Sequence, residues 1–155
     1  MDWLRSAARR AGKFRRLGPA EMWLTIRIVG LLSIVRIALW TMPFRKVQAF
    51  AARLGSRRVS PKAKRLSPQQ LTSLVSVGAD YVPGASCLTQ AFVARAILKR
   101  YGYEPVLRIG VARDPGGAFQ AHAWVEMDGE VIIGQVGMLG QYSTFPEIQP
   151  AAMPK

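Results

Sequence analysis

An apolar stretch from Met22 to Phe44 approaches the length of a membrane span and constrains what this chain can fold into. A spanning helix needs about 20 mostly uncharged residues. Arg27 and Arg36 interrupt the stretch and leave two uncharged runs of only eight residues each. The two arginines are nine positions apart, so on a helix they project about 180° apart and no single face hides both. We therefore expect a buried or interface-seeking helix rather than a membrane span.

Pro43 is expected to end or kink this helix at Met42, because proline supplies no N–H. Residues 46–54 then resume a helical spacing of apolar side chains, and Gly55 is a suitable C-cap. The N-terminal part of the chain is therefore predicted to contain a helical hairpin with basic ends.

The charge of the chain is divided unevenly between two regions. Residues 1–65 hold 16 Lys and Arg against 2 acids, which gives +14, and residues 66–155 hold 6 against 7, which gives −1; together they make the total of +13. We expect region 1–65 to dock an acidic protein or peptide, or an anionic membrane surface, unless it is simply a core-forming hairpin with solvated charges. Nucleic-acid binding is disfavoured, because the basic residues flank an apolar helix without interleaved surface aromatics.

The neutral region 66–155 opens with a helix signal. Ser67 can cap a helix, Pro68 suits its first position, and Gln70 can reach back to complete a capping box. The chain has one cysteine, which excludes an internal disulfide and a zinc site built on several thiolates. No metal or cofactor is expected, and a reducing compartment, the cytoplasm, is favoured, with peripheral contact at the inner membrane face as a variant.

The single cysteine, Cys87, is predicted to lie at the start of a helix. Pro83 and Gly84 break the backbone just before it, and helical periodicity then runs to Tyr101. The unpaired N–H groups and the positive end of the helix dipole favour a thiolate there, and the same N–H groups suit an oxyanion. The competing interpretation is that Cys87 is a small buried apolar side chain.

The single histidine, His122, is predicted to lie on a strand of a hairpin. A strand is expected over 105–112, and Asp128 with Gly129 suits a two-residue type I′ turn after the strand of His122. With this turn as the loop, Trp124 faces Ile133 and His122 faces Gln135. A lone strand histidine is otherwise a structural residue.

This register suggests a catalytic set. A thiol peptidase needs an imidazole as base and a polar group that orients the ring. Gln135 could be that orienting group, because directly opposed cross-strand side chains share a face. Asp128 is the acidic alternative, but the turn places it about six residues from His122; Glu126 shares the face of His122 and lies two pairs away. The tail after Tyr142 holds three prolines and is expected to be irregular and unimportant to the chemistry.

The residues from Pro83 onward resemble a known family. The motifs are Cys-Leu-Thr-Gln at Cys87, Leu-Arg-Ile-Gly-Val at Leu107 and His-Ala-Trp-Val-Glu at His122. They are similar to those of the transglutaminase-like leader peptidases of lasso-peptide biosynthesis. The resemblance is strong over the central block of about 50 residues, and the basic, apolar N-terminal region adds a weaker, compositional likeness.

This resemblance implies an α+β, papain-like core in residues 66–155, in which Cys87 attacks and His122 is general base and then acid. It implies removal of the leader from a ribosomally made precursor, a separate ATP-dependent cyclase, and a separate leader-recognition protein, since the chain is too short to hold both parts. Relatives often carry an Asp after the histidine strand, where this chain reads Ile133-Gly134-Gln135. An amide-forming acyltransferase on the same Cys-His core is the alternative enzyme.

Overall fold

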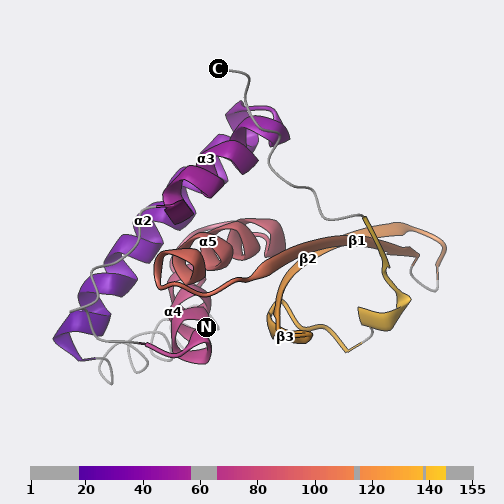
Figure 1. Cartoon of the computed structure of the whole chain (residues 1–155). Coiled ribbons are helices and arrows are strands. Elements are labelled where there is room, and N and C mark those ends of the chain that lie inside the picture. The colour runs from indigo at the N-terminus through magenta and orange to yellow at the C-terminus, as the bar shows by residue number, and fades with distance from the viewer. Residues whose placement is uncertain (1–17, 57–65, 114–115, 138, 146–155) are drawn as a thin grey trace, which may run out of the picture.

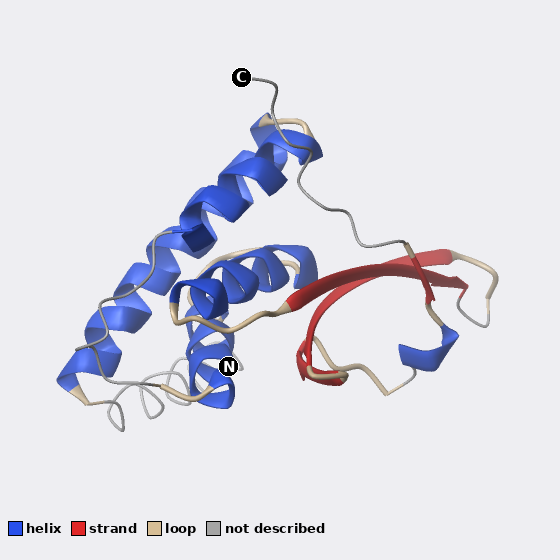
Figure 2. Cartoon of the chain, in the orientation of Figure 1, coloured by secondary structure: helices blue, strands red, loops and turns tan. Residues whose placement is uncertain are grey.

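A computed structural model of the chain describes residues 18–56, 66–113, 116–137 and 139–145 (Figure 1). These residues form an α+β fold in which helices precede a four-stranded antiparallel sheet. The elements are α2 (Pro19–Thr41), α3 (Phe44–Ser56), α4 (Pro68–Ala79), α5 (Cys87–Arg100), β1 (Val106–Arg113), β2 (Phe119–Met127), β3 (Glu130–Ile133), the 3₁₀ turn η1 (Leu139–Gln141) and β4 (Ser143–Thr144). Figure 2 shows the helices gathered on one side and the β1–β2 hairpin projecting away from them.

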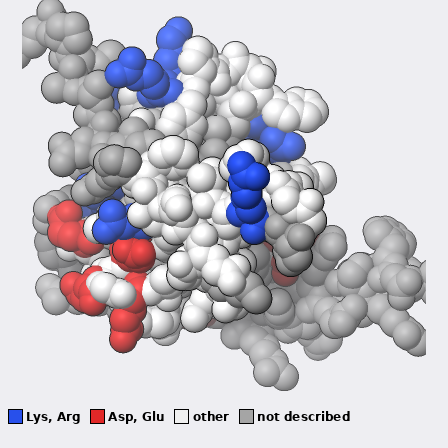
Figure 3. All heavy atoms as spheres, turned by 90° about the vertical axis from the view of Figure 1, so that its right-hand side faces the viewer, with Lys and Arg blue, Asp and Glu red and all other residues white. Residues whose placement is uncertain are grey.

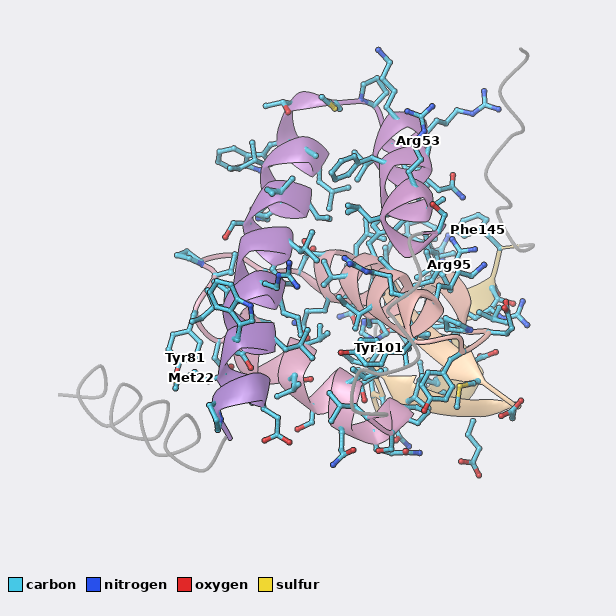
Figure 4. The ribbon with its side chains drawn as sticks, turned by 60° about the vertical axis from the view of Figure 1, so that its left-hand side comes forward. Met22, Arg53, Tyr81, Arg95, Tyr101 and Phe145 are labelled. Carbon is cyan, nitrogen blue, oxygen red and sulfur yellow. The ribbon has the colours of Figure 1, made fainter. Side chains whose placement is uncertain are left out.

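The helical hairpin is confirmed over α2 and α3. The Glu21 carboxylate accepts a hydrogen bond from the Gly18 amide at the start of α2, and α2 ends at Thr41, just before Pro43. Figure 4 shows α2 and α3 side by side. The C-cap predicted at Gly55 is wrong: Gly55 is buried inside α3, close to α5, and the helix runs on to Ser56.

The predicted capping box at the start of α4 is confirmed. The Ser67 hydroxyl accepts from the Gln70 amide at 3.2 Å, and the Gln70 side chain accepts from the Ser67 amide at 2.9 Å. Pro68 stands at the first helical position, where its missing N–H costs nothing. These local bonds fix where the chain turns from the segment before α4 into the helix.

The central helix is α5, whose residues from Ala91 to Leu98 are all buried. It contacts α2, α3 and α4 and lies against β2 and β1. One hydrophobic cluster therefore joins both predicted regions of the chain. Its largest fully buried members are Ile28, Leu32, Leu71, Phe92 and Leu98.

The sheet has the strand order β3-β2-β1-β4, and every pair is antiparallel. Side chains alternate across β2, because successive residues of a strand point to opposite faces. Ala123 and Val125 belong to the core under the helices, so His122 and Trp124 lie on the other face. The predicted irregular tail is wrong at its start, since Ser143 and Thr144 form β4 and pair with β1.

Candidate active site

Cys87 is the first residue of α5, as the sequence predicts. Its neighbour Ser86 is the N-cap, and the Ser86 hydroxyl accepts from the Thr89 amide at 3.3 Å. The thiol is half-buried and packs against the edge of the core. Among the described residues, the amides of Cys87 and Leu88 make no hydrogen bond, so two N–H groups of the first turn remain for a ligand oxygen.

The loop before Cys87 lies against α2. A Cβ built on Gly84 would lie 3.1 Å from Nη2 and 3.2 Å from Nε of Arg36, so this guanidinium packs on the loop three residues before the thiol. The same guanidinium lies over the ring of Trp40, 5.1 Å from its centroid. The N-terminal hairpin thus supplies a fixed positive charge beside the loop that leads into α5.

The ring of His122 is held by a backbone carbonyl. His122 pairs with Gly110 across β1 and β2, and its Nε2 lies 2.7 Å from the carbonyl oxygen of Gly134. A carbonyl oxygen only accepts hydrogen bonds, so Nε2 carries the proton. In the neutral ring this leaves Nδ1 without a proton. Nδ1 is therefore the nitrogen available as a general base.

The predicted pairing of His122 with Gln135 is wrong by one residue. In the structure Glu126 pairs with Val131 and Val125 pairs with Ile133. Two neighbouring residues of β2 are therefore opposite residues of β3 that are two positions apart. This β-bulge leaves Ile132 as the extra residue and ends β3 at Ile133. Gln135 is exposed and lies beyond the end of β3. The hydrogen bond to His122 that the sequence predicted for the Gln135 side chain is made by the carbonyl of Gly134.

Gly134 is the residue that brings this carbonyl to the imidazole. Its φ is +85°, and a Cβ at this position would lie 2.8 Å from the carbonyl oxygen of Ala123 and 3.0 Å from the Cα of Trp124. Only glycine combines this conformation with such a close approach to a neighbouring backbone. The ring-orienting group is thus backbone.

Aromatic rings surround the rest of the imidazole. The Trp124 ring lies nearly parallel to it, with centroids 6.1 Å apart, and the Tyr142 ring is tilted at 5.8 Å. A Cβ on Gly110 would lie 3.0 Å from both Trp124 and Tyr142, so the missing side chain on β1 makes room for the two rings. His122 therefore has ring contacts with Trp124 and Tyr142 in addition to its hydrogen bond with Gly134.

The two acidic alternatives lie elsewhere. The Glu126 carboxylate accepts from the Trp124 indole N–H at 2.7 Å and from Arg108 Nε at 3.0 Å. Asp128, with φ of +52°, and Gly129, with φ of +83°, form the predicted turn of the hairpin, and both are exposed. Glu126 thus braces Trp124, and neither carboxylate has a hydrogen bond to His122 in the described part of the chain.

The structure places the thiol and the imidazole on contacting elements without joining them. Helix α5 packs on β2, but His122 lies on the sheet face opposite the core residues Ala123 and Val125. No hydrogen bond links Cys87 to His122 among the residues described here. Figure 3 looks onto the projecting end of the sheet, where acidic side chains gather at one side and most of the described residues in view are uncharged.

Sequence reasoning missed Gly134, Trp124 and Tyr142 as neighbours of the histidine. The His-Ala-Trp spacing puts Trp124 on the face of His122 and could have found that residue. Tyr142 lies 20 positions after His122, directly before β4, and no local signal predicts its contact with the imidazole.

A helix that begins at the single cysteine packs on an antiparallel sheet that carries the single histidine, and this α+β arrangement is consistent with a transglutaminase-like core. A family model described as the transglutaminase-like superfamily matches residues 29–146, which is most of the chain and all of the site. The protein belongs to this superfamily, whose members are typically cysteine enzymes. No curated protein and no solved structure matches the chain.

Proposed function

We propose that this protein is a cysteine peptidase that removes the leader from a ribosomally made lasso-peptide precursor, with Cys87 as nucleophile and His122 as general base and acid. The observation that carries the proposal is the place of Cys87, at the first residue of α5 inside the superfamily match. The superfamily includes both cysteine peptidases and acyltransferases, and both begin with the same attack on a carbonyl.

The proposed chemistry uses Cys87 and His122, which lie on two elements in contact, α5 and β2. The Cys87 sulfur attacks the scissile carbonyl, and the amides of Cys87 and Leu88 stabilise the oxyanion. Nδ1 of His122 takes the thiol proton and returns it to the leaving amine, while Nε2 stays bonded to Gly134. Water then hydrolyses the thioester. Because His122 lies on the sheet face opposite the core, the proposal requires a rearrangement that brings Nδ1 within reach of Sγ in the substrate complex.

The lasso-peptide substrate rests on the sequence resemblance around Cys87 and His122. The same resemblance supplies the proposed partners, which are the leader peptide, a separate leader-recognition protein and an ATP-dependent cyclase. We place the protein in the cytoplasm, where precursor peptides are made. The basic hairpin is then available to the partners, with Arg36 linking it to the loop before Cys87.

An amide-forming acyltransferase is the second candidate, because the superfamily contains such enzymes and the thioester is common to both reactions. The two differ only in whether water or an amine accepts the acyl group. Addition of a primary amine to the reaction distinguishes them: a peptidase releases mainly the free acid of the leader, and an acyltransferase releases mainly the amide.

The direct test is mass spectrometry of a lasso precursor incubated with this protein and its recognition protein. Wild type is expected to release the leader, Cys87→Ala to release none, and Gln135→Ala, the matched control at an exposed position, to behave as wild type. An intact precursor in every reaction would overturn the proposed function. Equal cleavage by wild type and Cys87→Ala would remove Cys87 from it.

A further inference from the structure

Helix α2 has apolar side chains on two opposite sides, and only one of these sides packs against the rest of the protein. Thr25, Ile28, Leu32, Val35 and Ala38 are buried against the rest of the protein. The opposite face carries large apolar side chains that are strongly exposed: Trp23 62%, Ile26 51%, Ile34 50%, Ile37 61% and Trp40 81%. These side chains project within about 120° of one another, with Gly30 and Ser33 between them. Exposed apolar side chains gathered on one side of a helix indicate an interaction surface. We call these five residues the outer face of α2.

The ends and edges of the outer face carry the side chains that suit a lipid headgroup region. Trp23 and Trp40 stand near the two ends of the helix, and each has an arginine over its ring. The Arg27 guanidinium lies 5.9 Å from the Trp23 centroid and that of Arg36 lies 5.1 Å from the Trp40 centroid. Being nine residues apart, the two arginines border the outer face on opposite edges. Tryptophan and arginine side chains both favour the boundary between hydrocarbon and water.

The neighbouring helix adds positive charge. Arg45, Lys46 and Arg53 are exposed on α3, which has no acidic residue, and Glu21 is the one acid of α2. Figure 4 shows α3 beside α2, with Arg53 on the side of α3 that is turned away from α2. The hairpin therefore combines an apolar face bordered by Arg27 and Arg36 with further positive charge on α3, and this charge complements an anionic surface.

The fold also sets the orientation of α2. By length and composition, Glu21–Thr41 is apolar enough to cross a membrane. Its inner side, however, is packed against α4 and α5; a Cβ on Gly78 of α4 would lie 3.1 Å from Ile28. A helix held in this way offers lipid one side only and lies parallel to the surface.

We propose that the outer face of α2 binds the interface of an anionic membrane, with α2 lying flat and Arg27 and Arg36 at the headgroups. The partner we propose is a lipid surface, because an arginine lies over a tryptophan ring near each end of α2. The site is separate from Cys87 and His122, so its test needs no catalytic activity.

The test is sedimentation of the protein with vesicles of mixed phosphatidylglycerol and phosphatidylcholine, and with vesicles of phosphatidylcholine alone. Wild type is expected to bind the anionic vesicles with a blue shift of tryptophan emission, and to bind less as salt rises. The double variant Ile37→Ser/Trp40→Ser should lose about tenfold or more in partitioning, because each side chain carries apolar area into the interface. Arg36 is left unchanged, since it also packs on Gly84.

The matched control is Phe119→Ser, which removes an apolar side chain that is 71% exposed at the start of β2, far from α2 in Figure 1. It should bind vesicles as wild type does, and circular dichroism should show all variants folded. Absence of wild-type binding to anionic vesicles, or equal loss in control and double variant, would overturn the proposal. So would a double variant that keeps vesicle binding but loses self-association or binding to the recognition protein, which would assign the face to a protein.

Discussion

Replacement of Gly134 by alanine tests the geometry around His122 most sharply. Two costs are expected. Holding alanine at a φ of +85° costs about 1–2 kcal/mol relative to a right-handed conformation. The new Cβ would lie 2.8 Å from the Ala123 carbonyl oxygen, and forcing such a group into a packed site costs about 1–3 kcal/mol more. Together they lower the free energy of unfolding by about 2–5 kcal/mol.

Gly102→Ala is the matched control. Gly102 has a φ of +90°, and no atom lies within 4 Å of a Cβ built there, so only the conformational cost applies. For a chain of this size, about 1 kcal/mol corresponds to 2–4 °C in Tm. We expect Gly134→Ala to lower Tm by about 4–20 °C and Gly102→Ala by about 2–8 °C, measured by circular dichroism. Equal shifts in the two variants would refute the close approach of Gly134 to β2.

The same variant reports on the imidazole. Loss of the hydrogen bond from His122 to Gly134, worth about 0.5–1.5 kcal/mol, should lower turnover about 2- to 13-fold at a temperature where the variant is folded. Gln135→Ala should stay within about twofold of wild type, because its exposed side chain does not orient the ring. His122 is the single histidine, so ¹⁵N NMR reads its tautomer directly; wild type should carry the proton on Nε2. A proton on Nδ1 in wild type, or a large loss in Gln135→Ala, would contradict the assignment.

Three further predictions follow from individual contacts. Ser86→Ala removes the cap of α5 and should lower stability by about 1 kcal/mol in urea unfolding, whereas Ser76→Ala on the exposed side of α4 should change it little. Glu126→Ala leaves an indole N–H without its acceptor and should cost about 1–3 kcal/mol, against nearly nothing for the exposed Glu130→Ala; equal costs would argue against the bracing role. Burial raises the pKa of Tyr101 above its ordinary 10.0, outweighing the opposing effect of nearby arginines. The folded state then holds this proton longer than the unfolded state, so stability should fall as pH rises above about 10, and Tyr101→Phe should flatten that fall.

Local signals predict much of this fold. The capping box at Ser67, the break at Pro43, the helix start at Cys87 and the turn at Asp128 each depend on a few neighbouring residues, and the structure contains all four. These features can be predicted because they depend on hydrogen bonds and φ preferences within four or five neighbouring residues.

The surroundings of His122 are harder to predict from the sequence, because they depend on the pairing between strands. A single extra residue at Ile132 shifts the register of β3. The Asp128-Gly129 turn does not predict a bulge three residues after Gly129. Tyr142 reaches the histidine through β4, a two-residue strand that local propensity cannot predict. The orienting group was missed for a further reason: it is a backbone carbonyl, and every residue carries one.

The most direct test of the central claim is the rate of leader release by wild type and by His122→Gln, followed by intact mass of the precursor. Cys87→Ala lacks the single thiol of the chain and gives the background rate. If His122 takes the thiol proton in the substrate complex, wild type should release the leader about 10²- to 10⁴-fold faster than His122→Gln. Equal rates in the two folded proteins would contradict the pairing of Cys87 with His122.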